Sequence, residues 1–145
     1  MRFLLLSILV ILAGFCISIE GALAAYDDAL HTEVNETGEG RFEVDARGNS
    51  TLPLEFIRQA ALLRAAEATL KSGAPAFRIL RGQKRTITRR RPPYTKSFAI
   101  FIEVETKKAE TPPSPDQKWL DAKKVVNRLV PALREEAKNL GIWKE

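Results

Sequence analysis

Apolar and polar residues alternate strictly over residues 41–47, and a looser alternation, with one consistently apolar face, recurs over residues 76–80 and 97–106. A period of two is typical of a strand that buries one of its faces. The segment between the second and third strands, residues 81–96, is charged and contains two adjacent prolines. We therefore expect three strands, of which the last two are antiparallel and joined by a long hairpin loop.

Residues 54–71 carry apolar side chains three and four positions apart, which is the period of an amphipathic helix. Thr51 is placed to cap this helix, Pro53 to lie in its first turn and Gly73 to follow its last turn. The segment is rich in alanine, which favours the helical state and lets a helix lie close to a sheet.

A second helical period runs from residue 119 to residue 140. The preceding Ser-Pro-Asp-Gln, residues 114–117, offers a capping serine, a proline at the first position and a glutamine at the third. Pro131 is expected to kink or split this helix, because proline lacks an N–H and clashes with the preceding turn. Gly141 is expected to end it.

These elements follow the order strand, helix, strand, strand, helix (β-α-β-β-α), which predicts an α+β fold. The simplest arrangement is a three-stranded, mainly antiparallel sheet with both helices on one face. The other face would then carry Ala99 and Phe101 together with Glu103 and Glu105, and this mixed face would be open to solvent or to a partner. We expect a single domain over residues 41–145, preceded by a flexible acidic leader over residues 25–40.

Residues 1–24 have the pattern of an export signal. Arg2 precedes an apolar run over residues 3–19, and a string of small residues follows. A positive start, an apolar middle and an Ala-x-Ala end are typical of a secretory signal peptide. We expect cleavage between Ala24 and Ala25 and an exported product, either periplasmic or extracellular.

Two alternatives keep the protein at the membrane. The apolar run, about 17 residues and slightly short of a comfortable span, could remain uncleaved as an N-terminal anchor. The single cysteine, Cys16, could instead carry a lipid, as in bacterial lipoprotein signals. Those signals place a small residue immediately before the cysteine, and the bulky Phe15 opposes lipidation here. Cleavage after Ala24 would leave a product without a disulfide or a thiol nucleophile.

Charge is unevenly distributed along the chain, whose net charge is +5. Residues 25–47 contribute −5, from seven acids and two arginines. Arg2 and Glu20 cancel, so the part from Gly48 onward carries +10. A basic body behind an acidic leader indicates either a self-shielding segment or attraction to anionic surfaces.

The densest charge lies in residues 81–91, where six cations and no acid occur within eleven residues. The cations are Arg81, Lys84, Arg85, Arg89, Arg90 and Arg91. Arginine forks bind phosphate and carboxylate groups, and Tyr94 adds an aromatic face. We expect a solvated loop that pairs with the acidic leader or with Glu103 and Glu105. The alternative is an anion-binding site for lipid headgroups or envelope glycans, and nucleic acid is not expected as a partner.

Residues 42–51 contain a strand that ends in Arg-Gly-Asn, and residues 61–70 contain Leu-Leu-Arg-Ala-Ala-Glu-x-Thr-Leu. Residues 121–131 add an Asp-Ala…Val…Leu-x-Pro pattern. In these motifs the chain resembles a family of small, uncharacterised bacterial envelope lipoproteins, over residues 41–80 and loosely over residues 119–133. The resemblance implies an envelope location and a related fold, and it brings no catalytic residue. The chain departs from the family in its lipid-attachment signal and in its basic segment.

Three further polar groups are candidates for a site. Arg64 and Glu67 stand three residues apart on the predicted helix, as an ion pair at the edge of the packed face or as a buried pair at a site. Asn49 is expected to hydrogen-bond within its own turn or to accommodate a left-handed backbone, and the alternative is contact with a ligand. His31, the only histidine, is expected to be solvated, and the alternative is a metal site with carboxylate partners such as Asp27, Asp28 and Glu33.

No motif indicates catalysis, since the chain has neither a Gly-rich phosphate loop nor a metal-ligand cluster. We expect no catalytic residue, no cofactor and no metal, and therefore a non-enzymatic interaction protein of the envelope. The alternative from another class is a small hydrolase that uses Glu103 and Glu105 as acid and base. A pocket containing either carboxylate would favour the hydrolase, and a flat solvated face would favour the interaction protein.

Overall fold

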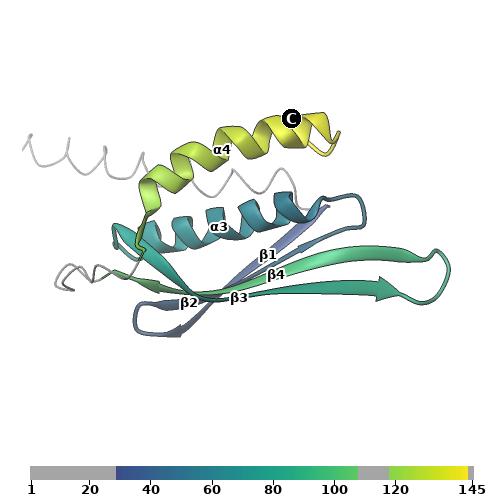
Figure 1. Ribbon diagram of the computed structural model, residues 1–145. Coiled ribbons are helices and arrows are strands. Elements are labelled where there is room, and N and C mark those ends of the chain that lie inside the picture. Colours follow the sequence, from purple (N-terminus) through teal and green to yellow (C-terminus); the bar gives the residue numbers. More distant parts are fainter. Residues whose placement is uncertain (1–28, 108–117, 144–145) are drawn as a thin grey trace, which may run out of the picture.

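The computed structural model describes residues 29–107 and 118–143 (Figure 1). Within them lies a five-stranded antiparallel sheet in the order β1-β2-β4-β3-β5, with two helices on one side. The strands are β1 (Leu30–Gly38), β2 (Arg41–Gly48), β3 (Ala76–Arg89), β4 (Thr95–Thr106) and β5 (Leu120–Asp121). The helices are α3 (Leu54–Lys71) and α4 (Ala122–Asn139). The α+β class expected from the sequence is confirmed, but the predicted three-stranded sheet is wrong, because β1 and β5 bring it to five strands.

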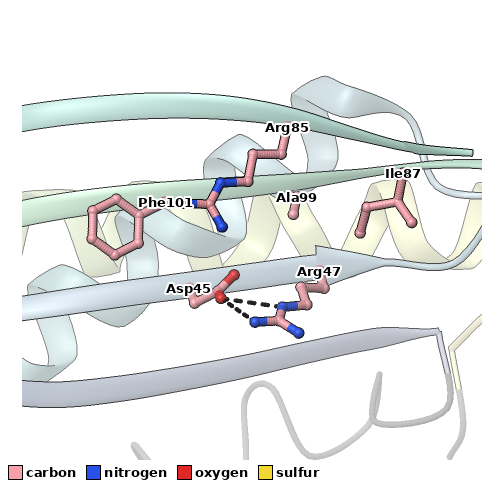
Figure 2. Close-up of a pocket in the computed structure, with 6 residues that line it drawn as sticks. All are labelled: Asp45, Arg47, Arg85, Ile87, Ala99 and Phe101. Carbon is pink, nitrogen blue, oxygen red and sulfur yellow. Dashed lines mark hydrogen bonds and ion pairs between the residues drawn. The ribbon is translucent and has the colours of Figure 1, made fainter.

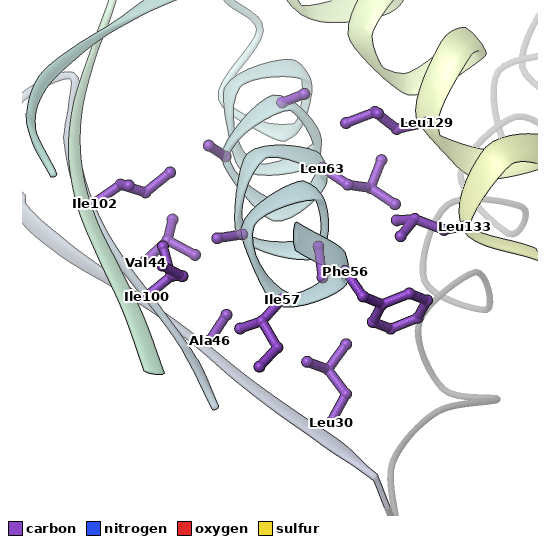
Figure 3. Close-up of a cluster of buried hydrophobic side chains, with 14 of the residues drawn as sticks. Leu30, Val44, Ala46, Phe56, Ile57, Leu63, Ile100, Ile102, Leu129 and Leu133 are labelled. Carbon is purple, nitrogen blue, oxygen red and sulfur yellow. The ribbon is translucent and has the colours of Figure 1, made fainter. Parts of the chain in front are cut away.

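The core lies between the sheet and α3 (Figure 3). Val44 and Ala46 of β2 point toward the helix together with Ile100 and Ile102 of β4, and all four are buried. Ile57 of α3 packs against this face of the sheet and is fully buried as well. The alternation along β2 and β4 therefore separates a helix-covered face from an open face.

The molecule has three layers, because α4 lies on α3 (Figure 1). Leu63 of α3 points toward Leu129 and Leu133 of α4 (Figure 3). Both helices are on the expected side of the sheet, but α4 contacts α3 more than it contacts the sheet, which it approaches near β3 and β5. Enclosure on two sides explains why α3 is rich in small residues, since its fully buried alanines let both neighbours approach closely. These are Ala60, Ala61, Ala65 and Ala66.

Strand β1 corrects the prediction of a flexible leader, because residues 30–38 pair with β2 along their length. The prediction failed because β1 has few apolar residues, and a strand at a sheet edge is held mainly by backbone hydrogen bonds. Gly40, at φ +70°, allows the tight turn into β2. The Gly40 carbonyl oxygen accepts bonds from the Thr106 N–H at 2.8 Å and the Thr106 hydroxyl at 3.1 Å.

Strand β3 corrects the prediction of a basic hairpin loop. It runs to Arg89 rather than ending at Leu80, and it pairs with β4 as far as Arg89 opposite Thr95. The register shifts between Ile79 and Arg81, which disrupts the alternation at this point. Beyond the shift Ile87 is the strand's single large apolar residue, so the sequence of this part lacks the apolar period that marks a half-buried strand.

Helix α3 has the bounds that the sequence predicts, but its cap is different. Pro53 is the N-cap and provides no side-chain bond. The Thr51 N–H and hydroxyl instead bond to Asn49 Oδ1, at 2.9 and 2.6 Å. The prediction that Asn49 bonds within its own turn is therefore confirmed.

Helix α4 begins later than expected, at Ala122, and the Asp121 carboxylate caps it by accepting from the Lys124 N–H at 2.9 Å. The start expected at residues 114–117 lies outside the described residues, and Trp119 precedes the helix. The helix continues through Pro131, so the split, which was one of the two predicted outcomes, does not occur. Pro131 is exposed, which leaves its ring free of the core.

Candidate functional site: a basic ribbon and the open sheet face

The β3–β4 hairpin projects beyond the rest of the sheet as a two-stranded ribbon (Figure 1). Strand β2 last pairs with β4 where Arg47 lies opposite Ala99. Strands β3 and β4 continue past this point, from Thr86 opposite Phe98 to Arg89 opposite Thr95. The helices do not cover this extension (Figure 1). Its side chains are therefore presented to the surroundings on both faces.

The ribbon is strongly basic. Residues 81–98, which form the ribbon and its root in the sheet, contain seven cations and no acid; the seventh is Lys96, which lies outside the basic segment 81–91. Lys96 lies opposite Thr88, and its Nζ is 5.6 Å from the centre of the Phe98 ring. Tyr94 at the tip is 76% exposed.

The predicted anion-binding residues do not form one cluster, because they are spread along an extended strand. Arg81 and Arg89 are separated by eight residues, or about 27 Å of strand. One set lies at the root of the ribbon, and it consists of Arg81, Lys84 and Arg85. The second set lies at the tip, and it consists of Arg89, Arg90 and Arg91. The tip set is compact enough to contact one anionic surface.

A cavity of about 180 Å³ opens on the sheet face at the root of the ribbon (Figure 2). Its lining is Asp45, Arg47, Arg85, Ile87, Ala99 and Phe101. Arg47 donates to Asp45 Oδ2 from Nε at 3.1 Å and from Nη2 at 2.5 Å. This hydrogen bond, together with the Asp45 charge, raises the pKa of Arg47. Within the described residues, Arg85 has no such acidic partner.

In this cavity the Arg85 guanidinium lies beside an apolar surface. Ala99 and Phe101 of β4 form its floor, and Ile87, which is 47% exposed, lies beside them (Figure 2). Neither Glu103 nor Glu105 lines it. The alternation along β4 predicts that Ala99 and Phe101 lie on the open face, and the structure places them there. Arg85 and Ile87 could not be placed from the sequence, because they lie in the part of β3 that is predicted as a loop.

The other end of the open face is a structural ion cluster centred on Glu105. Its Oε2 accepts from Arg78 Nε at 2.7 Å, and Arg78 Nη2 also contacts it. Its Oε1 accepts from Arg41 Nη2 at 3.5 Å. The Arg78 guanidinium lies over the Trp119 ring, 5.1 Å from its centre. Glu105 therefore ties β2, β4 and β3 together, which gives the carboxylate a structural role.

Glu103 lies between Glu43 of β2 and Arg81 of β3 in the sheet register. It is half-buried on the open face. In residues 29–107 and 118–143 no group of three His, Cys, Asp or Glu side chains is placed to hold a metal ion. His31 is exposed on β1, opposite Arg47.

The expected pair on α3 is present, and one of its members is buried. Arg64 Nη1 donates to Glu67 Oε2 at 3.1 Å, with Glu67 5% exposed and the Arg64 side chain 31% exposed. Burial raises the pKa of Glu67, and Arg64 opposes this effect only in part. Glu67 Oε1 has no hydrogen-bond partner in the part of the chain that the structure describes. The pair belongs to the packed interior and is remote in the fold from the ribbon tip.

The predicted signal peptide and its cleavage site, between Ala24 and Ala25, lie outside the described residues. The two described helices are not of the length and apolar character needed to cross a membrane. The resemblance to envelope lipoproteins remains a prediction. No protein-family model matches the chain, and no curated protein matches it.

Proposed function

We propose that this protein is an exported, non-enzymatic interaction protein of the cell envelope that binds anionic lipid surfaces through the tip of its β3–β4 ribbon. The observation that carries the proposal is the projecting ribbon itself, residues 86–98, which contains four cations and no acid: Arg89, Arg90, Arg91 and Lys96. The projection lets the tip reach a planar surface before the rest of the molecule does.

The charge at the tip is sufficient for measurable binding. A Lys or Arg close to an anionic bilayer contributes about 1 kcal/mol. Arg89, Arg90, Arg91 and Lys96 together would contribute about 4 kcal/mol, roughly a thousandfold in partitioning. Tyr94, an exposed aromatic side chain with a polar hydroxyl, suits the interface between headgroups and acyl chains.

The open sheet face supports an interaction role over a hydrolytic one. Glu105 holds two arginines, and the cavity at the ribbon root contains neither of the carboxylates considered for acid–base chemistry. Arg85 beside an apolar floor can add a contact to a phosphate group that bears an apolar substituent.

Sedimentation with vesicles of zwitterionic lipid, alone or mixed with anionic phosphatidylglycerol, tests the proposal. The variant combines Arg89→Ser, Arg90→Ser and Arg91→Ser. The matched control combines Lys123→Ser, Lys124→Ser and Arg128→Ser, which removes the same charge from the exposed side of α4. Soluble heparin serves as a competing polyanion without a bilayer.

We expect binding to anionic vesicles that weakens as salt increases, because salt screens exposed charges. The ribbon variant should bind about a hundredfold more weakly and the α4 control within about threefold of the natural protein. Failure to bind at low salt, or equal binding by the ribbon variant, would overturn the proposal. Binding to heparin without binding to vesicles would assign the ribbon to an anionic glycan.

A further inference from the structure

The sheet has two free edges among the described residues. Strand β1 pairs with β2 on one side only, and β5 covers β3 only at Ala76 and Phe77. The outer side of β3 over residues 79–89 therefore has no strand beside it in the described parts of the chain. Free edges carry unpaired backbone N–H and C=O groups that can pair with a further strand.

These two edges have opposite charge. Strand β1 contains Glu33 and Glu36 and no Lys or Arg. Residues 79–89 of β3 contain four cations and no acid, namely Arg81, Lys84, Arg85 and Arg89. Like charges at each edge oppose pairing of an edge with its own kind, and opposite charges favour pairing of β1 with β3.

Strand direction also permits this pairing. Each neighbouring pair in the sheet is antiparallel, so β1 and β4 run one way while β2 and β3 run the other way. A second copy in the same orientation would place its β1 antiparallel to β3 of the first, with the helices of both copies on one side. The sheet would continue with its existing pattern.

One register matches both length and charge. The nine residues of β1 fit opposite residues 80–88 of β3, with Leu30 beside Thr88. Glu33 then lies opposite Arg85, and both belong to the open face of the sheet. Thr32 lies opposite Thr86 on the other face, which is a favourable cross-strand pair.

We propose that copies of this chain associate head to tail, with β1 of one copy pairing antiparallel with β3 of the next. The interface is heterologous, because a different edge is used on each partner, and such contacts build open chains or rings. The assembly does not depend on lipid binding, since it uses the edges of the sheet and leaves the ribbon tip free.

Sedimentation velocity of the purified exported protein, over a range of concentrations and without lipid, tests this assembly. We expect oligomers whose mass rises with concentration at about 0.01 M salt and falls at about 1 M salt, where charges are screened. Glu33→Arg and Arg85→Glu should each shift the protein toward monomer. The double variant Glu33→Arg with Arg85→Glu restores opposite charges across the junction and should recover the oligomers.

The control exchanges charges elsewhere, by Glu55→Arg with Arg58→Glu on the exposed surface of α3, and should leave the oligomers unchanged. A monomer under all conditions would overturn the proposal. A second result would also overturn it: the natural protein forms a closed dimer, the single variants disrupt that dimer, and the double variant does not recover it. This combination would indicate that like edges pair with each other.

Disulfide cross-linking gives a second readout that does not depend on charge. Glu33→Cys with Arg85→Cys should give a ladder of oligomers on a non-reducing gel. Two strands lie between β1 and β3 in one copy, which places the two cysteines about 14 Å apart, beyond the reach of an internal disulfide. The control is Glu33→Cys with Arg58→Cys, in which the second cysteine lies on the exposed surface of α3, away from the junction. An equally strong ladder from this control would contradict the predicted junction.

Discussion

At the scale of single residues, Glu67 is a carboxylate whose burial destabilises its charged form. Its pKa in the folded protein lies above the ordinary value of 4.5 because desolvation outweighs the Arg64 interaction. Between those two values the folded chain binds more protons than the unfolded chain. The contribution of Glu67 to stability is therefore largest below 4.5 and is lost as pH rises through the folded pKa.

Glu67→Gln tests this linkage, because a neutral amide keeps an oxygen for Arg64 and does not titrate. The free energy of unfolding, from urea denaturation at a series of pH values, should favour the variant increasingly as pH rises through that window. The difference should then level off. Parallel pH profiles for the two proteins would contradict the assignment.

Gly48 shows that the close approach of β2 to α3 requires a residue without a side chain. A Cβ at Gly48 would lie 2.4 Å from Ile57 Cδ1 and 3.1 Å from Leu52 Cβ. Gly48→Ala should lower the free energy of unfolding by about 1–3 kcal/mol through overpacking.

The matched control for Gly48→Ala is Gly38→Ala, because a Cβ at Gly38 meets nothing within 4 Å. Urea denaturation should give nearly equal stability for this control and the natural protein. Equal losses in both variants would indicate a backbone effect rather than the contact with Ile57.

At the scale of elements, the sequence predicts best where an apolar period is unbroken. Helix α3 has the predicted bounds because its apolar and small residues contact a layer on each side. Strand β1 and the outer part of β3 were missed because backbone pairing, rather than side-chain burial, holds an edge strand or a ribbon. The basic residues of the ribbon can be identified from the sequence. Their division between the root and the tip cannot, because it depends on the outer part of β3, which the sequence does not predict as a strand.

Helix α4 offers a test at this scale, because Pro131 lies in its interior and is exposed. Pro131→Ala supplies the missing N–H and a better helix former, against a smaller gain in the freedom of the unfolded chain. The free energy of unfolding should rise by about 1–2 kcal/mol in urea denaturation. A loss of stability would show that Pro131 is needed for the orientation in which α4 packs on α3.

At the scale of the whole molecule, the layers separate stability from interaction. The core is closed between the sheet, α3 and α4, whereas the ribbon contributes little to it. Substitutions at the ribbon tip should therefore change binding without changing thermal unfolding. The combined serine variant at positions 89–91 should unfold within about 2 °C of the natural protein by circular dichroism.

The export prediction is also a property of the whole molecule. Intact mass of the protein recovered from its host should correspond to the 121 residues from Ala25 to Glu145. A mass that includes residues 1–24 would indicate a retained anchor. An added lipid mass at Cys16 would show that Phe15 does not prevent lipidation.

The projection of the ribbon has a consequence for protease exposure. Arg90 and Arg91 are exposed at its tip, where a trypsin-like protease can cut the chain between them. The cut would leave β1, β2, α3 and β3 in one fragment and β4, β5 and α4 in the other. Strand β4 lies between β2 and β3 in the sheet, so the fragments would remain associated. The protein is therefore expected to keep its fold after the chain has been cleaved at the ribbon tip.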